Sequence, residues 1–235
     1  MARLPRLAAA GCVHLVTQRG NNGQALCADD LDRERFVQLL AEAASAQQVA
    51  IHGWSLSESE LLLLATPSEA AGLSRMMQSL GRRYVAGFNR RHGRSGTLWE
   101  GRFRATAIEP ETQFLDCLAY VEKAPVRAGL AAAAQEHRWS SARHHLGLAT
   151  DALVADHPQY WTLGNTPFER EAAHRALLER GLARSREGDI AAAAAKGWAL
   201  GSAAFAAALA ERTGRRVLPA RRGRPPGRKP AAISR

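Results

Sequence analysis

The chain has 235 residues, of which 46% are apolar, and its formal net charge is +10 with a pI near 10.6. The apolar content excludes wholesale disorder and allows a folded core in one domain plus an appendage, or in two small domains. A basic surplus of this size predicts a polyanionic partner, with nucleic acid ahead of an anionic membrane.

The positive charge falls in two stretches. Residues 212–235 hold nine Lys and Arg and no acid, and residues 75–104 hold eight Arg against the single acid Glu100. The three cysteines, Cys12, Cys27 and Cys117, have no metal-site spacing, which favours a reducing compartment. We expect a cytoplasmic, nucleoid-associated protein, because no signal-peptide-like segment and no membrane-length apolar run is present.

Hydrophobic periodicity predicts seven elements in the first part of the chain. They are a strand at 13–17, a helix at 29–48, strands at 49–56 and 61–66, a helix at 68–91, a strand at 102–109 and a helix at 111–123. The strand at 61–66 is apolar on both faces, which predicts a central position. This order indicates an α+β fold with a ferredoxin-like or RRM-like antiparallel sheet and helices on one face.

Beyond residue 131 the sequence becomes rich in alanine. We expect helices at 167–182, 189–198 and 202–213, with Ser202 as an N-cap and Gly214 as a C-terminal cap. The last two could form a helical hairpin or a helix-turn-helix. The predicted organisation is a domain at 1–147, a small helical C-terminal region at 148–214 and a disordered basic tail at 215–235.

The tail contains the sequence RRGRPPGRKP at 221–230. Its Gly and Pro residues prevent a helix, and the Arg-Gly-Arg-Pro core around Arg222 and Arg224 resembles an AT-hook. Such a segment would place its arginines in the minor groove of A·T-rich duplex. A generic basic tail that adds only electrostatic affinity is the alternative.

Several blocks in the central region occur in a characteristic order. They are QRGNN at 18–22, MQSLGRRY at 77–84, GTLWEGRFR at 96–104, YVEKAPVRAGL at 120–130 and WSS at 139–141. Together they resemble the single-tyrosine HUH-type transposases of insertion sequences and their REP-associated relatives. The resemblance implies a single-stranded DNA cutter. In it, a histidine pair on one strand holds a divalent metal, and a helix-borne tyrosine forms a 5′-phosphotyrosine.

The metal motif of the family is degenerate in this chain. The resemblance places the histidine pair at Glu60 and Leu62, a further histidine at Leu15 beside His14, and an asparagine at Ala124. Leucine cannot ligate a cation, and one carboxylate holds Mg²⁺ poorly. We therefore expect no bound metal, with Mg²⁺ or Mn²⁺ only if the enzyme is active; His52, Glu58 and Glu60 are the residues from which a rebuilt site could come.

The family tyrosine is present as Tyr120, which helical geometry turns away from the apolar stripe of its helix. The alternatives are an ordinary half-exposed tyrosine or a platform on which a base stacks. The hypothesis is a DNA-binding protein of this family with impaired chemistry; an active nickase using Tyr120 and a decaying mobile-element product remain open. The candidate DNA contacts are Arg19, Arg75, Arg82, Arg83, Arg90, Arg102 and Arg104, with Arg222 and Arg224 in the tail. The partner is single-stranded or hairpin DNA, and the tail adds A·T-rich duplex.

Overall fold

A computed structural model describes residues 6–219 of the chain, so the predicted AT-hook with Arg222 and Arg224 lies outside the described residues. The strands are β1 (His14–Arg19), β2 (Val49–Leu56), β3 (Glu60–Pro67) and β4 (Arg104–Ala107). The longer helices are α1 (Asp30–Ala46), α2 (Gly72–Arg91), α3 (Pro110–Glu122), α7 (Pro167–Arg180), α8 (Arg184–Lys196) and α9 (Ala203–Thr213). The short helices are α4 (Ala124–Arg127), α5 (Ala142–His145) and α6 (Pro158–Trp161), with 3₁₀ turns at Asn21–Gly23 and Ala134–Glu136.

The four strands form one antiparallel sheet in the order β2-β3-β1-β4. With α1 between β1 and β2, and α2 between β3 and β4, this is the predicted ferredoxin-like arrangement. β1 and β3 are the central strands, as the apolar run in β3 predicted. Their register pairs Arg19 with Glu60 and Thr17 with Leu62.

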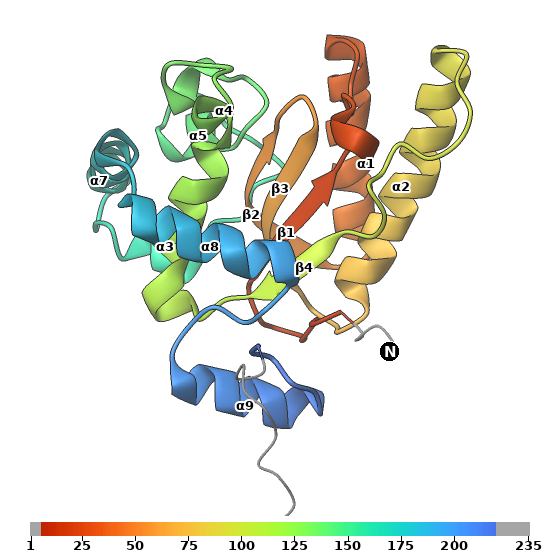
Figure 1. The fold of residues 1–235 in the computed structure, drawn as a ribbon. Helices are drawn as coiled ribbons and strands as arrows, with labels where there is room; N and C mark the ends of the chain where they lie inside the picture. The colour runs from red at the N-terminus through yellow and green to blue at the C-terminus, as the bar shows by residue number, and fades with distance from the viewer. Residues whose placement is uncertain (1–5, 220–235) are drawn as a thin grey trace, which may run out of the picture.

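Helices cover both faces of the sheet, which corrects the prediction of one covered face (Figure 1). Leu61 and Leu63 pack toward α1 and α2, while Leu62 and Leu64 pack toward α3 and α8. Because successive side chains of a strand point to opposite faces, a strand that is apolar at every position needs two covering layers. The second layer comes from α3 and the C-terminal region.

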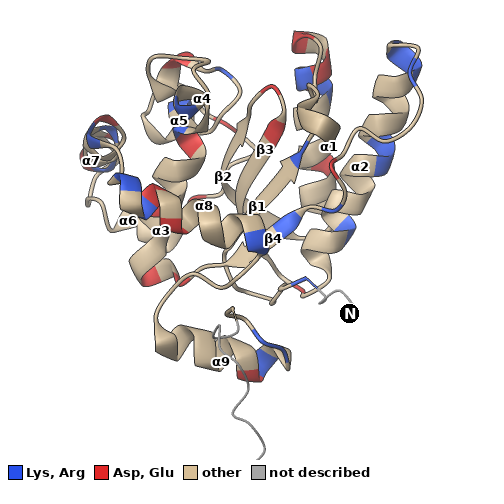
Figure 2. Ribbon diagram, in the orientation of Figure 1, with Lys and Arg blue, Asp and Glu red and all other residues tan. Residues whose placement is uncertain are grey.

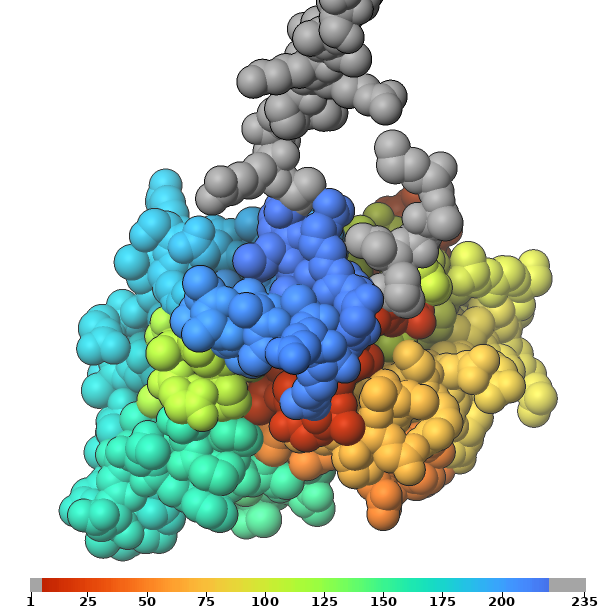
Figure 3. All heavy atoms as spheres, turned by 90° about the horizontal axis from the view of Figure 1, so that it is seen from below, coloured from red at the N-terminus to blue at the C-terminus, as the bar shows by residue number. Residues whose placement is uncertain are grey.

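The C-terminal helices pack directly on the first part of the chain. Ile190 and Ala194 of α8 join the cluster beneath α3 and β3. Leu209 of α9 packs with Leu7 near the N-terminal end of the chain, and Figure 3 shows α9 lying over that segment. Because α8 and α9 pack on different clusters, they form neither the hairpin nor the helix-turn-helix considered from the sequence.

Local capping chemistry fixes several of these helix ends. The Ser202 hydroxyl accepts a hydrogen bond from the Phe205 N–H at the start of α9, and Gly214 has φ +61° at its end, so both predicted caps are confirmed. The predicted start of α8 was wrong, because the helix begins at Arg184, five residues before the predicted position 189. In the part of the chain that the structure describes, no helix is long and apolar enough to cross a membrane.

Candidate nucleic-acid interface

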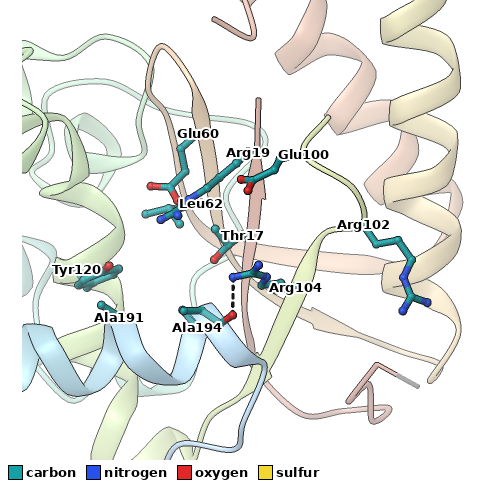
Figure 4. A pocket seen from close by; sticks show the side chains of 11 residues that line it. Thr17, Arg19, Glu60, Leu62, Glu100, Arg102, Arg104, Tyr120, Ala191 and Ala194 are labelled. Carbon is teal, nitrogen blue, oxygen red and sulfur yellow. Dashed lines mark hydrogen bonds and ion pairs between the residues drawn. The ribbon is translucent and has the colours of Figure 1, made fainter. Parts of the chain in front are cut away.

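The residues singled out around the degenerate motif meet in one small pocket of about 50 Å³ between the sheet, α3 and α8 (Figure 4). Arg19 comes from the end of β1, Glu60 from the start of β3 and Tyr120 from the last turn of α3. The pocket is lined by Thr17, Arg19, Glu60, Leu62, Glu100, Arg102, Arg104, Tyr120, Ala191, Ala194 and Ala195. Arg19 and Tyr120, which are 101 positions apart in the sequence, thus share one site.

Glu60 and Leu62 do not form a metal site. The Arg19 Nε donates to Glu60 Oε1 at 2.7 Å, so the one carboxylate at these two positions already has a cationic partner. Leu62 is 3% exposed and belongs to the apolar cluster under α3, together with the fully buried Leu15. The side chains present therefore do not fit the divalent ion that the family resemblance implies.

Tyr120 is half-buried and lines the pocket rather than open solvent. The guanidinium carbon of Arg127 lies 3.8 Å from the centre of its ring. Burial raises the pKa of the Tyr120 hydroxyl, and the negative charge of Glu60 adds to this rise. The positive charges of Arg127 and Arg19 partly oppose it. The phenol is thus protonated at neutral pH, which is unfavourable for a nucleophile without further activation.

Helix α8 lies across one side of this pocket with its alanine-rich face. Two side chains of β4 hold the end of the helix: Arg104 Nη1 donates to the Ala195 carbonyl at 2.5 Å, and Thr106 Oγ1 donates to the Ala193 carbonyl at 3.1 Å. These bonds satisfy carbonyls at the C-terminal end of the helix, where cations are also favourable.

A larger groove of about 770 Å³ runs between α2 and the segment that precedes β4. Its lining combines arginines with the half-buried ring of Trp99, and Figure 2 shows basic residues on the outer side of α2. Its lining includes Arg6, Gln18, Arg75, Met77, Gln78, Arg82, Val85, Trp99, Arg102 and Phe103. Cations that contact phosphates and exposed rings on which bases stack are the two features of single-strand binding sites.

A third pocket of about 290 Å³ connects this groove with the site at Tyr120. It shares Arg102 and Phe103 with the groove, and Arg102 and Arg104 with the Tyr120 pocket. Lys196 and Trp198 line its other side. The three pockets therefore adjoin one another, and their arginines form a basic path from α2 to Tyr120.

Two of the candidate DNA-contacting arginines of α2 are held by acidic side chains. Arg75 pairs with Glu69 and Arg83 pairs with Glu42 of α1, both at 2.5 Å. Arg82 and Arg90 make no ion pair with any described residue. The acid from α1 approaches only in the folded chain, so helical periodicity could not predict this pairing.

The metal site considered at His52, Glu58 and Glu60 does not form. His52 lies toward the other end of the β2–β3 hairpin, where Nδ1 contacts the Ala155 carbonyl at 2.6 Å and Nε2 contacts Thr66 Oγ1 at 2.9 Å. Burial lowers the pKa of His52 to about 4, so the ring is neutral. His14 is also buried, with a pKa lowered by burial to about 4, and it does not line the Tyr120 pocket.

Sequence reasoning missed a buried polar cluster behind Tyr120. The Glu122 carboxylate accepts hydrogen bonds at 2.6 Å from Ser141 Oγ, His145 Nδ1 and His174 Nε2. Burial alone would raise the pKa of Glu122, but the two histidines outweigh it and lower this pKa. Burial alone would lower the pKa of His145, but the Glu122 carboxylate outweighs it and raises this pKa. Only the glutamate's place two residues after Tyr120 could have drawn notice, because His174 lies 52 residues away.

Comparison with solved structures shows a REP-associated tyrosine transposase bound to a REP hairpin, with a TM-score of 0.54 and 13% identity over 67% of this chain and 92% of that chain. A putative transposase from Deinococcus radiodurans R1 has a TM-score of 0.35 and 16% identity over 48% of this chain and 91% of that chain, which is too low to support an argument. No protein-family model and no curated protein matches the sequence. The chain has the fold of a REP-associated tyrosine transposase, as its sequence blocks predicted.

Proposed function

We propose that this chain is a DNA-binding protein of the single-tyrosine transposase family that grips single-stranded or hairpin DNA and has lost metal-dependent chemistry. The observation that carries the proposal is the basic path from α2 to Tyr120, with the half-buried rings of Trp99 and Trp198 on its lining. The similar solved transposase is bound to a REP hairpin, which supports the same class of ligand here. A location at the nucleoid follows from such an affinity.

The arginines of the path divide by their partners. Arg82 lines the groove without an ion pair to a described residue, whereas the neighbouring Arg83 is paired with Glu42 and does not line it. Arg102 belongs to all three pockets. We infer that Arg82 and Arg102 contribute more to DNA affinity than Arg83, because a guanidinium already held by a carboxylate gains less from a phosphate.

The experiment is hairpin binding by fluorescence anisotropy over a series of salt concentrations. Arg82→Ala is expected to weaken binding severalfold and to reduce the slope of log K against log salt by about 1, as the loss of one phosphate contact does. Arg83→Ala is the matched control, on the same helix and with the same charge change. Equal effects of the two variants, or binding without salt dependence, would contradict the proposed interface.

A second candidate function is strand cleavage by Tyr120, favoured by its position beside Arg19 and Arg104 in one pocket. Its test is a covalent adduct on a denaturing gel, formed from labelled hairpin DNA with Mg²⁺ or Mn²⁺. A band that disappears in Tyr120→Phe would establish an active enzyme. We expect no adduct, and we expect Tyr120→Phe to leave hairpin affinity within about twofold of wild type, because removing one hydroxyl leaves the arginines and the ring in place.

A further inference from the structure

The guanidinium of Arg19 lies beside the two strand positions at which the family resemblance puts metal ligands. Arg19 and Glu60 are direct cross-strand partners on β1 and β3, and the next pair on the same face is Thr17 with Leu62. The side chain of Arg19 therefore projects over the two positions at which the family resemblance puts its metal ligands (Figure 4). Its Nε contacts Glu60 at 2.7 Å, and a guanidinium has further N–H groups with which to bind an anion.

The charges around the pocket leave a positive excess. Arg19, Arg104 and Arg127 surround the Tyr120 side of the site, against Glu60 and Glu100. Neither Arg104 nor Arg127 makes an ion pair with any described residue. A divalent cation beside Arg19 would meet repulsion and only one carboxylate at the two motif positions, whereas an anion would meet the guanidinium groups of Arg19 and Arg104.

The size of the pocket limits what enters. About 50 Å³ is several times the roughly 10–15 Å³ that one water needs, and far below the roughly 300–1,000 Å³ of sites that enclose small organic ligands. The space suits one compact anionic group whose attached sugars and bases lie in the connected pocket lined by Arg102 and Phe103. A single phosphodiester of a nucleic-acid strand has this shape and charge.

We propose that Arg19 and Arg104 bind one phosphate group of a nucleic acid beside Tyr120 without a divalent ion, and that Glu60 positions Arg19. This inference rests on the proposed DNA-binding function and names how the site at Tyr120 takes part in it. The hydroxyl of Thr17 lies on the same lining and can donate to the same phosphate.

The test is titration of the full-length protein with a thymidine trinucleotide, in EDTA and in excess Mg²⁺. Mg²⁺ is expected not to strengthen binding, beyond the weakening that any added salt causes. Glu60→Gln is expected to tighten binding about threefold to tenfold, because it removes a like charge from a phosphate site and leaves Arg19 in place. Arg19→Ala is expected to weaken it at least fivefold and to reduce the salt slope by about 0.7, the value for one single-strand phosphate contact.

The opposite results would overturn the inference. A site that uses Glu60 as a metal ligand predicts stronger binding with Mg²⁺ and weaker binding in Glu60→Gln. Arg82→Ala serves as the control, because it alters hairpin binding at α2 and should leave the effect of Glu60→Gln unchanged. If hairpin binding persists while the trinucleotide shows metal dependence, the proposed function stands and this inference fails; if no DNA binds, the proposed function itself fails.

Discussion

Glu60 and Leu62 stand two residues apart on β3, but their surroundings differ in kind. Glu60 is at the start of the strand beside Arg19, with its side chain 26% exposed, whereas Leu62 is enclosed under α3 and α8. A donor at position 62 would be buried among apolar groups, at a cost that an ordinary polar side chain does not recover without a partner. The buried leucine at this position contributes instead to the apolar cluster under α3.

Among the buried charged residues that the structure describes, Glu122 is the one whose replacement is expected to lower the free energy of unfolding most. Glu122→Gln should destabilise the protein by about 3–5 kcal/mol near pH 6, because it breaks a buried ion pair with His145. The measurement is urea unfolding of wild type and variant from pH 4 to pH 9.

The pH dependence of that difference has a definite sign. Because folding lowers the pKa of Glu122, its ionised carboxylate stabilises the folded protein at pH values above its ordinary pKa of 4.5. This stabilisation is lost as the pH falls below 4.5 toward the pKa in the folded protein. The raised pKa of His145 contributes stability that is complete below 6.5 and lost as the pH rises through the folded value. The difference in the free energy of unfolding between wild type and Glu122→Gln should therefore decrease at both ends of the pH range. A difference that stays constant with pH would show that Glu122 acts through packing alone.

Among the elements, α8 has the greatest influence on the Tyr120 pocket, because this helix of the C-terminal region packs over the sheet and lines the pocket. Ile190 is fully buried against the cluster under α3, and the end of the helix is bonded to β4 through Arg104 and Thr106. The helix is not strongly amphipathic in sequence, because five of its thirteen residues are alanines and only one is a large apolar residue. Its position therefore follows from the one large apolar side chain and from the complementary surface of α3 and β3.

Ile190→Ala is expected to lower the free energy of unfolding by about 2–5 kcal/mol, the usual cost of emptying a well-packed site of this size. Ala192→Gln is the control, because it changes an exposed position of the same helix. If both variants unfold at the same urea concentration as wild type, α8 is not part of the cooperative core.

The whole molecule presents one basic path on its described surface, and its sequence adds a basic tail beyond residue 219. We predict that a chain ending after Pro219 keeps hairpin affinity largely unchanged but loses at least fivefold in affinity for A·T-rich duplex. The reason is that linking two binding segments raises the effective concentration of each at the DNA. The comparison is between A·T-rich and G·C-rich duplexes by anisotropy: an equal loss on both would show a purely electrostatic tail, and no loss would rule out a duplex contact.

The sequence alone determined the elements and the family likeness. Periodicity of two in β2 and of 3.6 in α2 gave their extents to within a few residues, since both patterns depend on which side of one element is buried. The sequence blocks identified the fold, and local chemistry identified the caps of α9. Glu60, Leu62 and Tyr120 were also found from the sequence, although not what surrounds them.

The tertiary structure decided everything that depends on contacts between distant segments. It paired Arg83 with Glu42 and Arg19 with Glu60, joined Glu122 to His174, and placed α8 over the pocket at Tyr120. The two ion pairs join residues 41 positions apart, and Glu122 and His174 are 52 positions apart, so no local pattern records these contacts. Their energy comes from charges and surfaces that meet only once the sheet has formed. The lining of the basic path and the pairing of Arg19 with Glu60 could therefore be read only from the folded chain, whereas the lack of histidines at positions 60 and 62 was already visible in the sequence.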